Sequence, residues 1–283
     1  MSEHPYVIAD VFTDTPLQGN PVAVFTDASS LDDTTMAALA RELNLSETVF
    51  VLPPRAAGAD ARIRIFTPAV EFPFAGHPVL GSAFVLAGER DRVALETGLG
   101  VVPITLERDG AGAVVFGRMA QPLPQIAPFP ADGAELFAAL GVAGSQLPLD
   151  CYRNGPATVY VALPDGAAVA ALSPNLQALA ALGPYNVSCF AGSGRRFTMR
   201  VFAPAMGVNE DPATGSAAGP LALHLARHGV IAYGAEIEIS QGAEIGRPSL
   251  LHARAQGSAD ALERIEVGGA AVIVARGVFT LPG

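Results

Sequence analysis

The sequence contains no lysine, and all 17 of its basic residues are arginines. This absence excludes a pyridoxal phosphate enzyme, because that cofactor is held as a Schiff base on a lysine. The 27 acidic residues leave a formal net charge of −10, which argues against nucleic-acid binding, since neutralising phosphates requires clustered cations. A small anionic ligand is still compatible with this charge, because a helix terminus can attract an anion locally.

Cysteines and long apolar runs are also scarce. Cys151 and Cys189 cannot form a framework of disulfides, so we expect a reducing, cytoplasmic environment. No apolar run is long enough to span a bilayer, and the first five residues show no export signal. No Gly-x-Gly-x-x-Gly follows a first strand and there is no P-loop, which disfavours a nucleotide-binding fold.

The sequence does contain an internal repeat. Arg64–Ala69 (RIFTPA) is echoed by Arg200–Ala205 (RVFAPA), and each copy is followed by a Gly-rich turn and an apolar, helix-like run. The spacing to the helix start differs by about three residues, as an insertion between duplicated units would produce. Because the first amides of a helix lack intrahelical partners and lie at its positive dipole end, each start favours an anion. The repeat therefore predicts a carboxylate or phosphate site in a cleft between two similar lobes.

A Pro-rich stretch near the middle of the chain indicates a linker. It separates an N-terminal lobe of residues 1–121 from a C-terminal lobe of residues 131–269, and a strand from about 270 to 283 is expected to return to the first lobe. Strands are expected at 6–12, 22–25, 48–52, 62–66, 158–163, 186–190, 197–202, 236–240 and 270–275, and helices at 34–43, 79–86, 134–140, 176–182 and 217–228. Many strands with short connections predict an α+β fold of antiparallel sheets around a few buried helices.

Six motifs, in order along nearly the whole chain, resemble the PhzF-like phenazine-biosynthesis isomerase family. They are Gly19–Pro21, Asn44–Thr48, Phe74–Pro78, Cys189–Arg196, Glu210–Pro220 and Gln241–Ser249. The resemblance implies the diaminopimelate-epimerase-like fold, in which two pseudo-symmetric lobes each wrap a curved, mostly antiparallel sheet around a central helix. It also implies a homodimer and a cofactor-free trans-2,3-dihydro-3-hydroxyanthranilate isomerase, whose substrate is a small anionic, amino-acid-like cyclohexadiene.

The wider fold is known for racemases that carry a cysteine at each of the paired helix starts. Here those places are occupied by Ala75-Gly76-His77 and by Asp211–Ser216, neither of which contains a thiol. A thiol pair therefore has no residues to exchange protons on opposite faces of a substrate. Three alternatives remain open: an amino-acid epimerase, a non-catalytic binder of aromatic acids, and a related isomerase with another small amino or hydroxy acid as substrate.

Glu47 matches the acid-base of the family by this resemblance. From composition alone it is a surface glutamate at the entry to a strand, although a carboxylate near an apolar wall and a helix dipole can be tuned to hold and release a proton near neutrality. The family's reaction moves hydrogen from C3 to C1 on one face of a small ring, so a single carboxylate suffices. Asn20 is a further substrate contact by resemblance, whereas by itself it reads as a turn residue.

The two helix starts supply the remaining candidates for substrate binding. Gly76 and His77 at the first, with Gly215 and Ser216 at the second, are expected to donate hydrogen bonds to a carboxylate. Asp211 is either a cap and dipole partner or an acceptor for an amino or hydroxyl substituent of the substrate, and both roles are compatible.

His224 and His228 are spaced i, i+4 on one helix face, as in zinc sites. No Glu follows His224 in the hydrolase pattern and no third ligand is marked nearby. We therefore expect no metal and interpret the pair as exposed or capping residues near the helix end. The sequence does not indicate a role for Gly246–Ser249.

Overall fold

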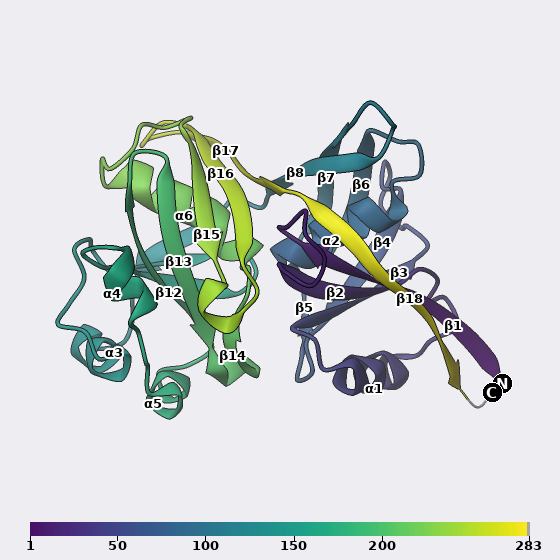
Figure 1. Cartoon of the computed structure of the whole chain (residues 1–283), viewed down its shortest axis with the longest axis horizontal. Coiled ribbons are helices and arrows are strands. Elements are labelled where there is room, and N and C mark those ends of the chain that lie inside the picture. The colour runs from purple at the N-terminus through teal and green to yellow at the C-terminus, as the bar shows by residue number, and fades with distance from the viewer. Residues whose placement is uncertain (282–283) are drawn as a thin grey trace. The chain divides into compact units, whose positions relative to one another are not determined.

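The computed structural model describes residues 1–281, and the chain divides into two compact units (Figure 1). Unit 1 comprises Met1–Ala120 together with the chain from Gly268 onward, and unit 2 comprises Gln121–Val267. The last strand, β18 (Ala271–Leu281), pairs with β1 inside unit 1. Residues 282 and 283, which the sequence assigned to this strand, lie outside the described residues.

Unit 1 is a sheet with two helices. Its elements are β1 (Ser2–Val11), β2 (Asn20–Phe25), α1 (Asp33–Leu43), β3 (Glu47–Leu52), β4 (Ala61–Phe66), β5 (Glu71–Phe72), α2 (Gly76–Leu86), β6 (Arg92–Thr97), β7 (Gly100–Arg108), β8 (Val114–Gln121) and β18. Helix α1 is amphipathic: Met36, Leu39 and Ala40 are buried, and Asn44 ends it in the left-handed conformation that asparagine adopts more readily than most residues.

Unit 2 has more helices around a similar sheet. Its elements are β9 (Gln125–Pro128), α3 (Gly133–Leu140), β10 (Asp150–Arg153), β11 (Ala157–Ala162), α4 (Gly166–Ala170), α5 (Leu176–Ala181), β12 (Tyr185–Ser193), β13 (Arg196–Ala203), η1 (Pro204–Met206), β14 (Val208–Asp211), α6 (Gly215–Arg227), β15 (Glu236–Gln241), η2 (Ala243–Ile245), β16 (Ser249–Gly257) and β17 (Leu262–Gly269). The expected linker is only partly free, because β9 pairs antiparallel with β10.

The two units share one sequence of strand pairings. In unit 1, β1–β2, β3–β4, β4–β5 and β6–β7 are antiparallel, while β2–β3 and β4–β6 are parallel. In unit 2, β10–β11, β12–β13, β13–β14 and β15–β16 are antiparallel, while β11–β12 and β13–β15 are parallel. The six-residue repeat is therefore the recognisable part of a duplicated unit. This pattern confirms the predicted α+β fold of two pseudo-symmetric halves.

One helix is enclosed in each unit. Residues 76–84 of α2 and 215–226 of α6 are buried all round, which is why these stretches lack the polar face of a surface helix. A glycine lets each helix approach its surroundings closely. A Cβ on Gly81 would lie 2.7 Å from Val22, and one on Gly219 would collide with Gln121 and lie 2.5 Å from Ile265.

The duplication extends to an ion pair that ties each repeated strand to the segment before its central helix. Arg64 donates from Nε and Nη2 to the two carboxylate oxygens of Glu71 at 2.7 and 2.6 Å, and Arg200 contacts Glu210 in the same bidentate manner at 2.8 and 2.8 Å. Each guanidinium also lies over the phenylalanine two residues on, at 5.0 and 5.1 Å from the ring centroid.

These ion pairs locate the three-residue insertion. In both units the helix begins five residues after the paired glutamate, at Gly76 and Gly215. The arginine and glutamate are separated by seven residues in unit 1 and by ten in unit 2. The extra residues of unit 2 therefore fall between strand and glutamate, where the 3-10 turn η1 is found.

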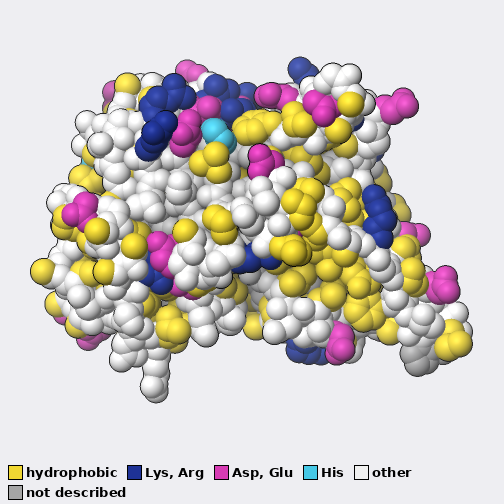
Figure 2. Space-filling view, viewed as in Figure 1, with side chains coloured by type: hydrophobic (Ala, Val, Ile, Leu, Met, Phe, Trp, Pro, Cys, Tyr) yellow, Lys and Arg dark blue, Asp and Glu magenta, His cyan; other side chains and the backbone are white. Residues whose placement is uncertain are grey.

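The face of unit 1 that carries β18 is partly apolar. Hydrophobic side chains gather over this strand in Figure 2, and Ile273 and Val278 are exposed there. Among the described residues, none of the helices has the combination of length and hydrophobicity needed to cross a membrane.

Candidate active site

Glu47 occupies the first position of β3 in unit 1. The parallel register pairs Glu47 with Val22 of β2. Glu47 therefore lies at the same end of these two strands as Asn20, the first residue of β2. The side chain of Glu47 is 13% exposed and Asn20 is fully buried. Composition alone suggested a surface position for Glu47, but its side chain is largely enclosed and lies near Asn20, the other residue predicted in this part of unit 1.

His77, in the first turn of α2, faces Glu47. Its Nε2 lies 3.5 Å from Oε2 of Glu47, and the ring donates its other N–H to the carbonyl of Pro21. Burial lowers the pKa of His77 to about 3, so the ring is neutral at physiological pH. With Nδ1 protonated, Nε2 presents a lone pair to the carboxyl group, at a separation somewhat longer than a hydrogen bond.

The first backbone amides of α2 can donate hydrogen bonds to a ligand. Ala75 precedes the helix and supplies no side-chain cap, and Pro78 has no N–H. The amides of Gly76 and His77 have no intrahelical acceptor, because they belong to the first turn. Within unit 1, the structure therefore brings together Asn20, Glu47, Gly76 and His77.

In unit 2, a hydrogen-bonded network shapes the turn before α6. The carboxylate of Asp211 accepts from the hydroxyl of Thr214 at 2.5 Å, and the amide of Thr214 donates to Oε1 of Gln241 at 3.0 Å. The Gln241 Nε2 group donates to the carbonyl of Asp211 at 2.7 Å and to the Thr214 hydroxyl at 3.0 Å. Asp211 is thus held in the turn by Thr214, and α6 has no side-chain N-cap.

Two carbonyl groups anchor the first turn of α6 to side chains of neighbouring strands. Gln121 donates to the carbonyl of Gly215 at 2.8 Å, and the Tyr160 hydroxyl donates to the carbonyl of Ala217 at 2.5 Å. Gly215 and Ser216 are both buried. The amides of Ala217 and Ala218 donate to the carbonyl of Thr214, whereas those of Gly215 and Ser216 precede the first intrahelical hydrogen bond, as at the start of α2.

Sequence reasoning missed three residues of this network: Gln121, Thr214 and Gln241. Thr214 and Gln241 belong to motifs that carried the resemblance, so that signal was present. Gly242, which follows Gln241, adopts a φ of 80°, and a Cβ there would lie 2.5 Å from the carbonyl of Pro212. The glycine thus permits β15 to end directly beneath the Asp211 turn.

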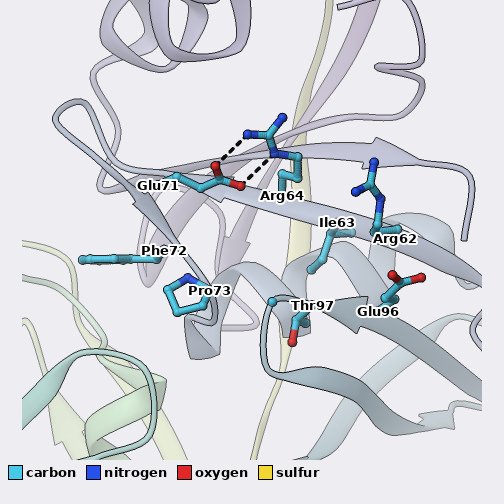
Figure 3. A pocket seen from close by; sticks show the side chains of 9 residues that line it. Arg62, Ile63, Arg64, Glu71, Phe72, Pro73, Glu96 and Thr97 are labelled. Carbon is cyan, nitrogen blue, oxygen red and sulfur yellow. Dashed lines mark hydrogen bonds and ion pairs between the residues drawn. The ribbon is translucent and has the colours of Figure 1, made fainter. Parts of the chain in front are cut away.

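A separate pocket of about 410 Å³ opens on unit 1 between β4, β5 and β6 (Figure 3). Three of its four charged side chains are already engaged, since Arg64 pairs with Glu71 and the Glu96 carboxylate accepts hydrogen bonds from the amides of Arg55 and Ala56. None of the residues predicted for substrate binding lines this pocket. We therefore do not assign the substrate to it.

The cysteines and two of the histidines lie elsewhere. Cys151 and Cys189 are buried within β10 and β12, and burial raises the pKa of Cys189 to about 12. Neither thiol lies at a helix start. The expectation that both His224 and His228 are exposed or capping was wrong for His224, which is fully buried, whereas His228 is the C-cap of α6.

The sequence is similar to those of known proteins over nearly its whole length. Residues 9–277 match the family described as Phenazine biosynthesis-like protein. The chain belongs to this family. It is 54% identical to a trans-2,3-dihydro-3-hydroxyanthranilate isomerase of Pseudomonas chlororaphis, covering 98% of this chain and 100% of that protein. The protein of the same name from Pseudomonas aeruginosa is also 54% identical, with 97% and 98% covered.

Solved structures agree with this assignment. A PhzF-family phenazine biosynthesis protein of Bacillus anthracis superposes with a TM-score of 0.85 at 25% identity, over 99% of this chain and 100% of the other. A hydroxyproline epimerase of Agrobacterium vitis, at 12% identity and a TM-score of 0.69 over 99% and 91% of the two chains, shares the fold. The family and fold inferred from the six motifs are therefore confirmed.

Proposed function

We propose that this protein is a cofactor-free isomerase of trans-2,3-dihydro-3-hydroxyanthranilate in phenazine biosynthesis. Full-length identity of 54% to isomerases of that name supports the substrate. The observation that carries the mechanism is the enclosed carboxyl group of Glu47, with the unprotonated nitrogen of His77 at 3.5 Å. The fold alone would allow an epimerase as well, but neither helix start carries a thiol.

In this mechanism Glu47 is the only proton carrier. Its carboxylate takes the proton from C3 of the substrate, and the electron pair left behind is delocalised over the conjugated ring. The protonated Glu47 then delivers that proton to C1 on the same face, giving an enol that becomes the ketone. When Glu47 is protonated, a small approach from the 3.5 Å separation would let neutral His77 accept a hydrogen bond from it, which holds the proton between the two transfers without removing it.

The remaining candidates hold the substrate. Amides near Gly76 and Gly215 and the Ser216 hydroxyl are proposed to bind its carboxylate, because unpartnered amides at helix starts favour an anion. Asp211 accepts from the amino or hydroxyl substituent, and its bond from Thr214 orients it. Exclusion of water around the bound ring would protect the proton in transit. We further propose a cytoplasmic homodimer, on the strength of the family resemblance.

Substitution of Glu47 by Gln tests the mechanism, since the amide keeps the shape but carries no proton. Turnover should fall by roughly 10²–10⁴-fold, while the affinity for a substrate analogue changes little. Glu96→Gln is the matched control, because the Glu96 carboxylate accepts hydrogen bonds from two backbone amides and is proposed to stabilise the fold without taking part in the reaction. Asp211→Asn should impair binding as well as turnover. A folded Glu47→Gln protein with near-normal turnover would end this mechanism.

A further inference from the structure

A cluster of potential metal ligands lies in unit 2, apart from every residue proposed for the isomerase reaction. Asp150, His224 and His228 each offer one ligand atom, and these atoms all lie within 4.8 Å of one another. Oδ2 of Asp150 is 3.0 Å from Nε2 of His228 and 4.0 Å from Nδ1 of His224. The histidine spacing was visible in the sequence, but the third ligand comes from β10, 74 residues before His224.

From this arrangement we propose that Asp150, His224 and His228 form a binding site for a divalent transition metal of the zinc class. Two imidazoles and a carboxylate are a ligand set that zinc commonly takes, with a water completing the tetrahedron. At a metal–ligand distance of about 2.0 Å, two ligands of a tetrahedron are about 3.3 Å apart. The observed 3.0 and 4.0 Å separations bracket that value, so small side-chain movements suffice.

The surroundings fix the ligands before a metal arrives. His224 is fully buried and stacks on Tyr160 at 5.2 Å between ring centroids, which holds the ring in place. Its Nδ1 lies 3.1 Å from the Tyr152 hydroxyl, and a metal bound to Nδ1 would replace this contact. Asp150 and His228 are 17% and 20% exposed, which gives an ion a path from solvent.

Two electrostatic features act on an ion in opposite directions. The site lies at the C-terminal end of α6, where the partial negative charge of the helix favours a cation. Arg227 places Nη2 3.9 Å from Oδ2 of Asp150 and would be repelled, but its side chain is 36% exposed and can turn to solvent. A bound metal would join β10 to the end of α6, so its effect is on the stability of unit 2 and not on turnover.

The test uses the untagged full-length protein, stripped with a chelator and titrated with Zn²⁺. We expect one saturable ion per chain, a melting temperature that rises with free Zn²⁺, and slower amide exchange in β10 and the end of α6. Co²⁺ in place of Zn²⁺ should give the visible absorption of a tetrahedral site. Catalytic turnover should be the same with and without metal, so the outcome is separate from that of the isomerase proposal.

Substitutions at the partly exposed positions identify the ligands without disturbing the buried His224. Asp150→Asn and His228→Gln should each weaken Zn²⁺ binding by at least about 100-fold, more than is typical for changes beyond the direct ligands. The control is His252→Gln, since His252 is another partly exposed histidine of unit 2, with Nδ1 3.8 Å from Glu236. Arg227→Gln should strengthen binding several-fold, because it removes the opposing charge. Absence of saturable binding, or equal loss in the His252 variant, would overturn the proposal.

Discussion

The two arginine–glutamate pairs of the duplicated strands allow one interaction to be compared at two levels of burial. In unit 2, the side chains of Arg200 and Glu210 are 8% and 13% exposed, and Nη1 of Arg200 also donates to three carbonyls, those of Val169, Ala170 and Leu172. In unit 1, the side chain of Arg64 is 20% exposed, and its partners Glu71 and Asp33 are 40% and 82% exposed.

Arg200→Ala should therefore destabilise unit 2 strongly. It leaves a largely buried carboxylate without its partner, a change that typically costs about 3–5 kcal/mol, and it removes the donor shared by three carbonyls. For a unit of this size we expect a fall in melting temperature of roughly 6–20 °C. Arg64→Ala should lower the free energy of unfolding by only about 1 kcal/mol, because water and ions already screen its ion pairs with exposed carboxylates.

Calorimetry with amide hydrogen exchange is the suitable assay, since the chain has no tryptophan to report unfolding by fluorescence. Exchange should accelerate mainly in unit 2 for the Arg200 variant. The double variant Arg200→Met, Glu210→Met should recover much of the lost stability, because paired apolar side chains remove the stranded charge. Equal destabilisation by Arg200→Ala and Arg64→Ala would refute the argument from burial.

Four further outcomes are expected. Burial lowers the pKa values of His77 and His224 to about 3 in the folded protein, against about 6.5 in the unfolded chain. The free energy of unfolding should therefore be at its full value above pH 6.5 and should fall by up to about 1.4 kcal/mol per pH unit per histidine on acidification towards pH 3. Chemical denaturation of metal-free protein at several pH values measures this dependence, and a flat profile would contradict it. Ser216→Ala should weaken binding of an aromatic acid analogue by about 1 kcal/mol or somewhat more in calorimetric titration, and a ligand-bound crystal with the acid away from both helix starts would refute the site. Exhaustive chelation should leave turnover at its full rate, and restoration of a lost rate by Zn²⁺ would show the cofactor-free proposal to be wrong. Sedimentation should give twice the 29.0 kDa chain mass, whereas a monomer at all concentrations would exclude the homodimer.

Periodicity and turn residues predicted much of the local structure. The amphipathic spacing of Met36, Leu39 and Ala40 and the left-handed Asn44 define α1, because these signals depend only on neighbouring residues. The repeat around Arg64 and Arg200 similarly indicated duplication. The Pro-rich stretch does begin at the boundary between the two units, at Gln121. The pairing of β9 with β10 within it was not predicted, because no local pattern encodes a pairing with a more distant strand.

The sequence by itself determined the family, the absence of lysine and helix-start thiols, and the identity of the candidate residues. Only the tertiary structure decided what surrounds them. A parallel register places Glu47 beside Asn20, and burial keeps His77 neutral with a lone pair towards that carboxyl group. Folding likewise brings Asp150 to His224 and buries a histidine that spacing had assigned to the surface. The protonation state of a histidine depends on its desolvation, and the number of residues that can bind one metal ion depends on contacts between distant segments. Both exist only once the chain has folded.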